Sequence, residues 1–156
     1  MHIRLIAVSD RQPPWVGDAF EEYVKRLPEQ WRFRLHTLAT ARRAGDGNAE
    51  QAVKAEGLNV LKQLKSSETV VLLDENGVEL SSEGLAARLN DWQTKGSDLA
   101  FVIGGPDGVS ADCAGRADFR WSLSRLTLPH GLARVVLAEQ LYRAWTLLQG
   151  HPYHRG

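Results

Sequence analysis

Cysteine is almost absent from this chain of 156 residues, in which Cys113 is the only example. A single cysteine excludes an internal disulfide framework and any zinc site built from several cysteines. The sequence also lacks an HExxH motif, a Walker-type phosphate loop and clustered carboxylates, so no metal site is predicted. Cys113 lies close to Ala111 and Ala114 in a short predicted helix, where we expect it to be a small buried side chain.

Long apolar runs are missing as well. No stretch reaches the roughly eighteen apolar residues that a membrane span requires, so no membrane association is predicted. The N-terminus MHIRLIAVSD lacks the basic start, apolar core and cleavage site of a signal peptide, and it is typical of a first strand instead. The default expectation is a cytoplasmic protein, and the length suits a single domain over 1–156 with one sizeable core.

Neither sign of charge is in excess, because 19 basic residues balance 19 acidic ones. A net charge of zero counts against a protein that coats nucleic acid non-specifically. A local basic surface is still compatible with this balance. Arg42 and Arg43 lie in a glycine-rich loop, and several further arginines crowd the last third of the chain: Arg120, Arg125, Arg134, Arg143 and Arg155. Taken singly, each is an ordinary solvated surface charge; as a group they favour a basic surface.

Strand and helix patterns alternate along the sequence. Strands are predicted at 2–9, 31–39, 68–74, 98–105 and 119–124. Helices are predicted from Pro13–Pro14 to Leu27, and then over 48–65, 82–95, 109–116 and 131–148. Apolar runs such as VVLLD and LAFVIGG are typical of strands covered on both faces, which indicates a parallel sheet and an α/β fold with crossover connections. The polar, glycine-rich segment 40–48 predicts a mobile loop.

Ligands of open α/β sheets bind outside the carboxyl ends of the strands. Three such ends stand out, at 72–74, 103–105 and 123–125. The segment GGPDG (104–108) follows a strand and precedes a short helix, and its paired glycines would let a ligand approach the backbone. It is not GxGxxG, so the dinucleotide fingerprint is missing. By itself GGPDG fits a plain strand-to-helix turn equally well.

The segment WSLSRLTLPH (121–130) is unusual because a strand leads into a second extended piece with no crossover helix between them. Such a segment exposes backbone N–H and C=O groups that could hold an adenine edge, although an irregular core segment is the alternative. His130 at its end is either a general base or a structural histidine.

The last helix carries an apolar stripe of the kind that often packs on another subunit. Glu139 and Arg143 are four residues apart and are predicted to pair on one face. In the tail HPYHRG, Tyr153 could stack on a base and Arg155 could hold a phosphate. Composition alone favours a frayed terminus for this tail.

Taken together, these segments resemble a known family. The marks are LLD (72–74), IGGPDG (103–108), WSLSRLTLPH (121–130), RVVLAEQLYRAW (134–145) and HPYHR (151–155). The whole chain resembles the RlmH-type ribosomal RNA large-subunit methyltransferases of the SPOUT superfamily. The resemblance implies a parallel sheet flanked by helices with a deep C-terminal trefoil knot, and a homodimer whose active sites draw on both subunits. It also implies methyl transfer from S-adenosyl-L-methionine to N3 of a pseudouridine in 23S ribosomal RNA, on assembled ribosomes.

The resemblance also implies roles for particular residues. The cofactor-binding set is Leu73, Gly104, Leu123, Ser124, Arg125, Leu126, Thr127 and Leu128. A basic cluster of Tyr153, His154 and Arg155, in its own subunit or supplied by the partner, is the first hypothesis for stabilising the anion that forms on the base, and His130 is the second candidate for proton removal. Three departures from the family pattern are small: Asp107 stands where glutamate is common, Ser9-Asp10 replaces a Gly-Lys pair, and Arg125 occupies a variable position.

Two other functions remain open at this stage. One is a dinucleotide-dependent oxidoreductase, which the missing GxGxxG and the missing acidic ribose partner after the second strand disfavour. The other is a non-catalytic RNA-binding or ribosome-assembly protein.

Overall fold

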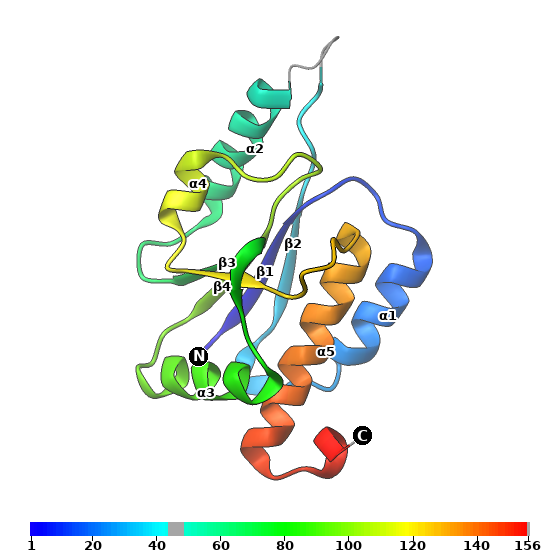
Figure 1. The fold of residues 1–156 in the computed structure, drawn as a ribbon, viewed down its shortest axis with the longest axis vertical. Coiled ribbons are helices and arrows are strands. Elements are labelled where there is room, and N and C mark those ends of the chain that lie inside the picture. The colour runs from blue at the N-terminus through cyan, green and yellow to red at the C-terminus, as the bar shows by residue number, and fades with distance from the viewer. Residues whose placement is uncertain (44–48, 156) are drawn as a thin grey trace.

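The computed structural model describes residues 1–43 and 49–155, which form a parallel sheet covered by helices on both faces (Figure 1). Five strands make up the sheet in the order β2-β1-β4-β3-β5. Their bounds are Ile3–Val8 (β1), Arg34–Leu38 (β2), Thr69–Glu79 (β3), Leu99–Ile103 (β4) and Phe119–Ser122 (β5). All neighbouring strands pair in parallel, as the apolar runs predicted. Residues 44–48 of the predicted mobile loop lie outside the described residues.

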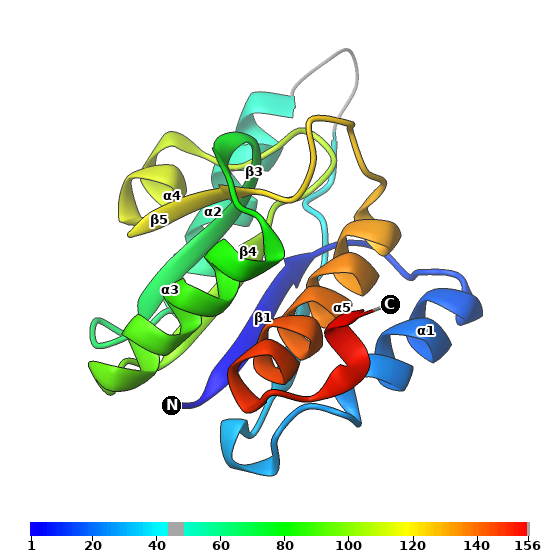
Figure 2. The ribbon, with the colours of Figure 1, turned by 60° about the horizontal axis from the view of Figure 1, so that its bottom comes forward.

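The helices divide between the two faces of the sheet. One face is covered by α1 (Pro14–Val24), α3 (Ser82–Thr94) and α5 (His130–Gln149), which lie side by side with α5 in the middle (Figure 2). The other face is covered by α2 (Ala49–Gln63) and α4 (Ala111–Arg116). Two short 3-10 turns, η1 (Glu29–Trp31) and η2 (Pro152–Arg155), complete the described elements.

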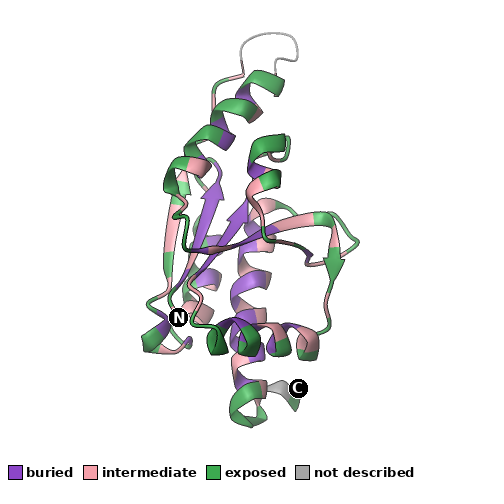
Figure 3. Cartoon of the chain, turned by 90° about the vertical axis from the view of Figure 1, so that its left-hand side faces the viewer, coloured by how far each residue is buried: buried purple, intermediate pink, exposed green. Residues whose placement is uncertain are grey.

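The strands alternate their side chains between two apolar clusters, because successive residues of a strand point to opposite faces. Leu5 and Phe101 pack with Leu137 and Leu141 of α5, and all four are fully buried. Ile6 packs on the opposite face, in a cluster that includes the buried Cys113. Figure 3 shows this burial along the central strands and along α5. Each fully buried large apolar side chain contributes about 1.5–3 kcal/mol to stability.

Two details predicted from single residue pairs are confirmed. Arg143 and Glu139 form an ion pair of 2.9 Å on one face of α5. Cys113 is buried, and burial raises the pKa of its thiol, so the side chain behaves as a small apolar group.

The second and third strands differ in extent from their predictions. The second was expected at 31–39, but Trp31 belongs to η1 and Arg32 takes a left-handed conformation with φ of 46°, so that β2 begins only at Arg34. The third was expected to end at 74, yet β3 continues to Glu79.

The extra length of β3 comes from an irregularity in its pairing with β5. Leu73 and Val78 both lie opposite Trp121, so the residues between them are looped out of the ladder. Asp74 stabilises the excursion, because its side chain accepts the Asn76 N–H at 2.9 Å. A Cβ on Gly77 would lie 2.7 Å from the Arg120 backbone, so only glycine lets the chain return to the ladder here. The Glu-Asn-Gly sequence therefore forms a bulge within the strand instead of ending it.

Within the described ranges, no helix combines the length and the apolar character that crossing a membrane requires.

Candidate active site

The sheet has a topological switch point between its two central neighbouring strands. The chain leaves β1 toward α1 on one face and leaves β4 toward α4 on the other, although the two strands pair side by side. Diverging connections of this kind open a crevice at the carboxyl ends of the strands. A cleft of about 810 Å³ lies at this edge. Its lining includes residues that follow four of the strands, among them Ser9, Thr40, Gly104 and Leu123, and Asp74 from the bulge within β3.

The GGPDG loop forms the floor of the cleft at the end of β4. It folds back on itself, because Gly105 and Gly108 form a bridge and the Gly108 N–H donates to the Gly105 carbonyl at 3.1 Å. A Cβ on Gly104 would lie 2.5 Å from Val109 Cγ1. The sequence suggested that these glycines admit a ligand; the structure adds that the loop itself needs Gly104 in order to close.

The segment 123–129 after β5 forms one wall and has no regular structure. Ser122 Oγ donates to the Ser124 carbonyl at 2.9 Å, and the Leu126 N–H donates to Ser124 Oγ at 2.9 Å. Thr127 Oγ1 donates to Glu75 Oε2 at 2.9 Å, which ties this wall to the bulge in β3. The segment forms neither a strand ladder nor a helix, and local polar contacts fix its conformation instead.

The structure brings most of the predicted cofactor residues together in the cleft. Those that line it are Leu73, Gly104, Leu123, Ser124, Leu126, Thr127 and Leu128. Arg125 does not line it: its side chain is 88% exposed and pairs with Glu79 at 3.1 Å.

Sequence reasoning missed the charged side chains of the cleft. Asp10, Asp74, Glu75 and Arg120 line it, so carboxylates outnumber cations on its walls. Asp74 is the last residue of 72–74, one of the three predicted strand ends, and that position was the available signal that it would lie in the cleft. The other charged residues lie on turns or a strand whose sequences suggest no ligand.

His130, the second candidate base, lies where α5 begins at the rim of the cleft. Both ring nitrogens are buried and have no hydrogen-bond partner among the described residues. Burial, together with the nearby Arg134 charge, lowers the pKa of His130 to about 4. Arg134 is itself buried, which lowers its pKa; its Nη2 donates to Ser9 Oγ at 3.0 Å and its Nε has no partner in the described part of the chain.

The other predicted catalytic residues lie at the opposite end of α5. Tyr153 donates its hydroxyl to Glu139 Oε1 at 3.0 Å and packs edge-on against the Tyr142 ring. Burial and the Glu139 hydrogen bond raise the pKa of Tyr153 to about 12. Arg155 is exposed, and the side chain of His154 is outside the described part of the chain.

Within one chain the tail and the cleft are far apart. Figure 1 shows the tail at the end of α5 opposite the loop that enters the helix from β5. The tail folds back along α5 as far as Glu139, which lies nine residues, or about 14 Å, from His130 at the rim of the cleft. The structure therefore does not bring Tyr153 and Arg155 to the cleft of the same chain, and the tail is packed on α5 instead of frayed.

A parallel α/β sheet with a cleft across its strand ends, closed by a glycine loop and an irregular wall, is the arrangement in which α/β proteins bind their ligands. The family described as "Predicted SPOUT methyltransferase" matches residues 1–154, and this chain belongs to it.

Individual relatives narrow the comparison further. The chain is similar to proteins named ribosomal RNA large subunit methyltransferase H. It is 49% identical to the one from Saccharophagus degradans, over 99% of this chain and 100% of the relative, and 46% identical to the one from Thioalkalivibrio sulfidiphilus, over 99% of both. In fold it is similar to a methylase family protein from Neisseria gonorrhoeae, with a TM-score of 0.56, 15% identity, and coverage of 90% of this chain and 81% of that one.

Proposed function

We propose that this chain transfers the methyl group of S-adenosyl-L-methionine to N3 of a pseudouridine in 23S ribosomal RNA, on assembled ribosomes in the cytoplasm. The single observation that carries the proposal is the full-length match to relatives named ribosomal RNA large subunit methyltransferase H. The cleft adds a place for the methyl donor, because it lies at the switch point where α/β sheets bind cofactors.

The walls of the cleft suit this methyl donor chemically. Leu73, Leu123 and Leu128 supply an apolar surface for the adenine, and the irregular backbone of 123–129 supplies polar groups for its edge. The donor carries a positive sulfonium and a positive ammonium group, and the carboxylates of Asp10, Asp74 and Glu75 complement them. When bound, the donor supplies an electrophilic methyl group, and the protein contributes alignment and the removal of water.

The proton on N3 has to leave before the nitrogen can attack the methyl group, and the predicted catalytic residues differ in what they offer. His130, with a pKa of about 4, is neutral near pH 7 and is a weak base. Tyr153, with a pKa of about 12, stays protonated and holds the tail against Glu139. The exposed guanidinium of Arg155 suits electrostatic stabilisation of the anion on the base.

A homodimer would bring the tail and the cleft together. We propose that α5 of one subunit packs antiparallel to α5 of its partner, so that the tail of each subunit reaches the cleft of the other. Exposed apolar side chains near the start of α5 support such a contact: Trp15, Leu126 and Leu132 are 52%, 74% and 41% exposed.

Two measurements test the proposal. Calorimetry should detect binding of S-adenosyl-L-methionine and no binding of NAD. Mass spectrometry of 23S RNA should find one methylated pseudouridine after purified ribosomes from cells lacking the protein are incubated with the chain and the methyl donor. Donor binding without any RNA methylation would contradict the proposal, and RNA binding without donor binding would favour a non-catalytic ribosome-assembly protein.

Mixed dimers test whether the tail acts across the subunits. A chain truncated after Gly150 and a full-length chain with Gly104→Val in the cleft should each be inactive. Mixing them should restore activity, because one site per mixed dimer then combines an intact cleft with an intact tail. Mixtures that stay inactive would argue for a tail that acts within its own subunit.

A further inference from the structure

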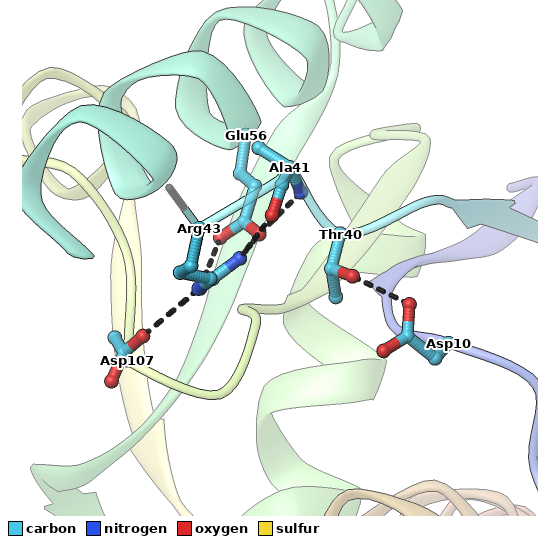
Figure 4. A network of polar contacts seen from close by, with 6 residues as sticks. All are labelled: Asp10, Thr40, Ala41, Arg43, Glu56 and Asp107. Atoms are coloured by element: carbon cyan, nitrogen blue, oxygen red, sulfur yellow. Dashed lines mark hydrogen bonds and ion pairs between the residues drawn. The ribbon is translucent and has the colours of Figure 1, made fainter. Parts of the chain in front are cut away.

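Three side chains from distant parts of the sequence form an ion-pair cluster behind the GGPDG loop (Figure 4). Arg43 lies after β2, Glu56 on α2, and Asp107 in the loop. Arg43 Nη1 donates to Glu56 Oε2 at 2.5 Å, and Arg43 Nη2 and Nε donate to Asp107 Oδ2 at 3.0 and 3.2 Å. Glu56 Oε2 also accepts the Ala41 N–H at 2.8 Å. The guanidinium thus links the loop to a carboxylate on a helix.

Glu56 is the fixed member of this cluster. It is 3% exposed, a burial that a carboxylate tolerates only when it is paired and hydrogen-bonded. A Cβ on Gly105 would lie 2.7 Å from Glu56 Oε1, so the first half of the loop rests directly on the carboxylate. A Cβ on the next helical residue, Gly57, would lie 2.1 Å from Ser110 Oγ. Helix α2 therefore contacts the loop at its start and immediately after its end.

The segment 40–43 also reaches the opposite rim of the cleft. Thr40 Oγ1 donates to Asp10 Oδ1 at 2.5 Å, and Asp10 belongs to the loop after β1 (Figure 4). Both Thr40 and Asp10 line the cleft, whereas Arg43 and Glu56 lie behind it. The ion-pair cluster is therefore placed to set the shape of the cleft without touching what fills it.

We propose that Glu56 is a positioning residue for the methyl donor: through Arg43 and Asp107 it holds the GGPDG loop in the conformation that binds S-adenosyl-L-methionine. The inference rests on the proposed function, because it needs the donor to bind in this cleft. It assigns a role to Arg43 and Glu56, which lie outside the segments that the sequence marked for cofactor binding, and to Asp107, which lies within GGPDG but outside the predicted cofactor-binding set.

The test compares two buried glutamates. Glu68 matches Glu56 closely: it is 7% exposed, pairs with Arg4 at 2.5 Å and accepts the Lys65 N–H at 2.8 Å. It lies at the amino edge of the sheet, away from the cleft. Glu56→Gln should raise the Kd for S-adenosyl-L-methionine about 10-fold, the effect of losing one charged hydrogen bond. Glu68→Gln should lower the melting temperature as much as Glu56→Gln does. It should leave the Kd for S-adenosyl-L-methionine unchanged.

A second pair of variants keeps the test independent of folding. Asp107 is 47% exposed, so Asp107→Asn leaves the buried pair in place and should raise the Kd about 2–5-fold. Asp107→Glu keeps the charge and should restore wild-type binding within about 2-fold. In methyl-transfer assays Asp107→Asn should raise the KM for the donor while kcat at saturation stays unchanged, a split that a general loss of stability does not produce.

The outcomes separate this inference from the proposed function. Absence of donor binding by the wild-type chain would overturn both. Donor binding by the wild type with an unchanged Kd in Asp107→Asn would overturn the positioning role alone. So would an equal weakening of donor binding by Glu56→Gln and Glu68→Gln, because the effect would then follow stability and not position.

Discussion

The two edges of the parallel sheet treat their polar groups differently. At the amino edge, Arg4 holds Glu68 and also donates to the Gln63 carbonyl, and Asp98 accepts the His2 N–H at 2.8 Å. The carboxyl edge also has a buried pair, Arg43 with Glu56, but there His130 and Arg134 keep buried nitrogens that have no partner among the described residues.

This difference separates stability from function. The pairs at the amino edge hold the starts of the strands together. Burial alone would raise the pKa of Glu68, but hydrogen bonds from Arg4 and from the Lys65 backbone outweigh burial and lower this pKa. Unpartnered buried groups at the carboxyl edge cost stability, about 1–3 kcal/mol each. Groups of this kind concentrate where a protein binds or reacts.

The largest expected effect breaks this division, because the tail lies at the amino-edge end of α5 and is nonetheless expected to matter for activity. Truncation after Gly150 should reduce methyl transfer at least about 100-fold through loss of the Arg155 charge, while the Kd for S-adenosyl-L-methionine stays unchanged. Methylation kinetics on ribosomes and calorimetry measure the two quantities. Arg34→Ala removes an exposed arginine outside the tail and serves as the control; equal loss in both variants would contradict a specific role.

The next effect concerns the amino edge alone. Arg4→Met leaves the carboxylate of Glu68 buried and unpaired, and should destabilise the fold by about 3 kcal/mol. Urea unfolding measures the change, and donor binding well below the unfolding transition should be unaffected. Arg34→Met, at an exposed position on β2, should cost little. Weakened donor binding in Arg4→Met would show that the two edges are coupled.

A smaller effect joins stability and binding at the β3 bulge. Gly77→Ala places a Cβ 2.7 Å from the Arg120 backbone, and should cost about 1–3 kcal/mol and weaken donor binding, because Asp74 and Glu75 lie in the same bulge. Gly17→Ala in α1 meets nothing within 4 Å and should stabilise the chain by up to about 1 kcal/mol. Thermal unfolding measures the stability of the two variants, and calorimetry measures their donor binding. Unchanged donor binding in Gly77→Ala would show that the bulge does not contribute to the binding site.

The last expected effect is a dependence on pH. The folded chain holds the pKa of His130 at about 4, below the ordinary value of 6.5, so the unfolded chain binds more protons between these values. Stability should therefore fall as the pH drops from about 6.5 toward 4. His130→Gln should flatten this part of the curve, as measured by urea unfolding at pH 7 and pH 5. An unchanged slope would contradict the buried, neutral histidine.

Most of the fold could be predicted because its strands are nearly continuous apolar runs. The extent of β3 could not, since the bulge depends on how Gly77 meets β5, some forty residues later in the chain. The site divides in the same way. Residues that follow strands, such as Gly104 and Leu123, lie beside the cleft by topology alone, and the family resemblance pointed to 123–128.

Other features of the site depend on contacts that no local pattern encodes. Glu56 and Asp107 are far apart in sequence and meet only through Arg43. The placement of Arg125 outside the cleft follows from the irregular path of its segment. The role that we propose for the tail depends on a second subunit, and both this role and the trefoil knot stay predictions.

The inner position of β1, between β2 and β4, has a consequence for how the chain folds during its synthesis. β1 pairs with β4, so the middle of the sheet cannot form until Phe101, the residue opposite Leu5, has been synthesised. At about 5–20 residues per second, translation separates the two by roughly 5–20 s. Until then β1 pairs only with β2 and leaves its other edge open. Contacts so distant in sequence make folding slow, so the nascent chain exposes an apolar strand edge for most of its synthesis.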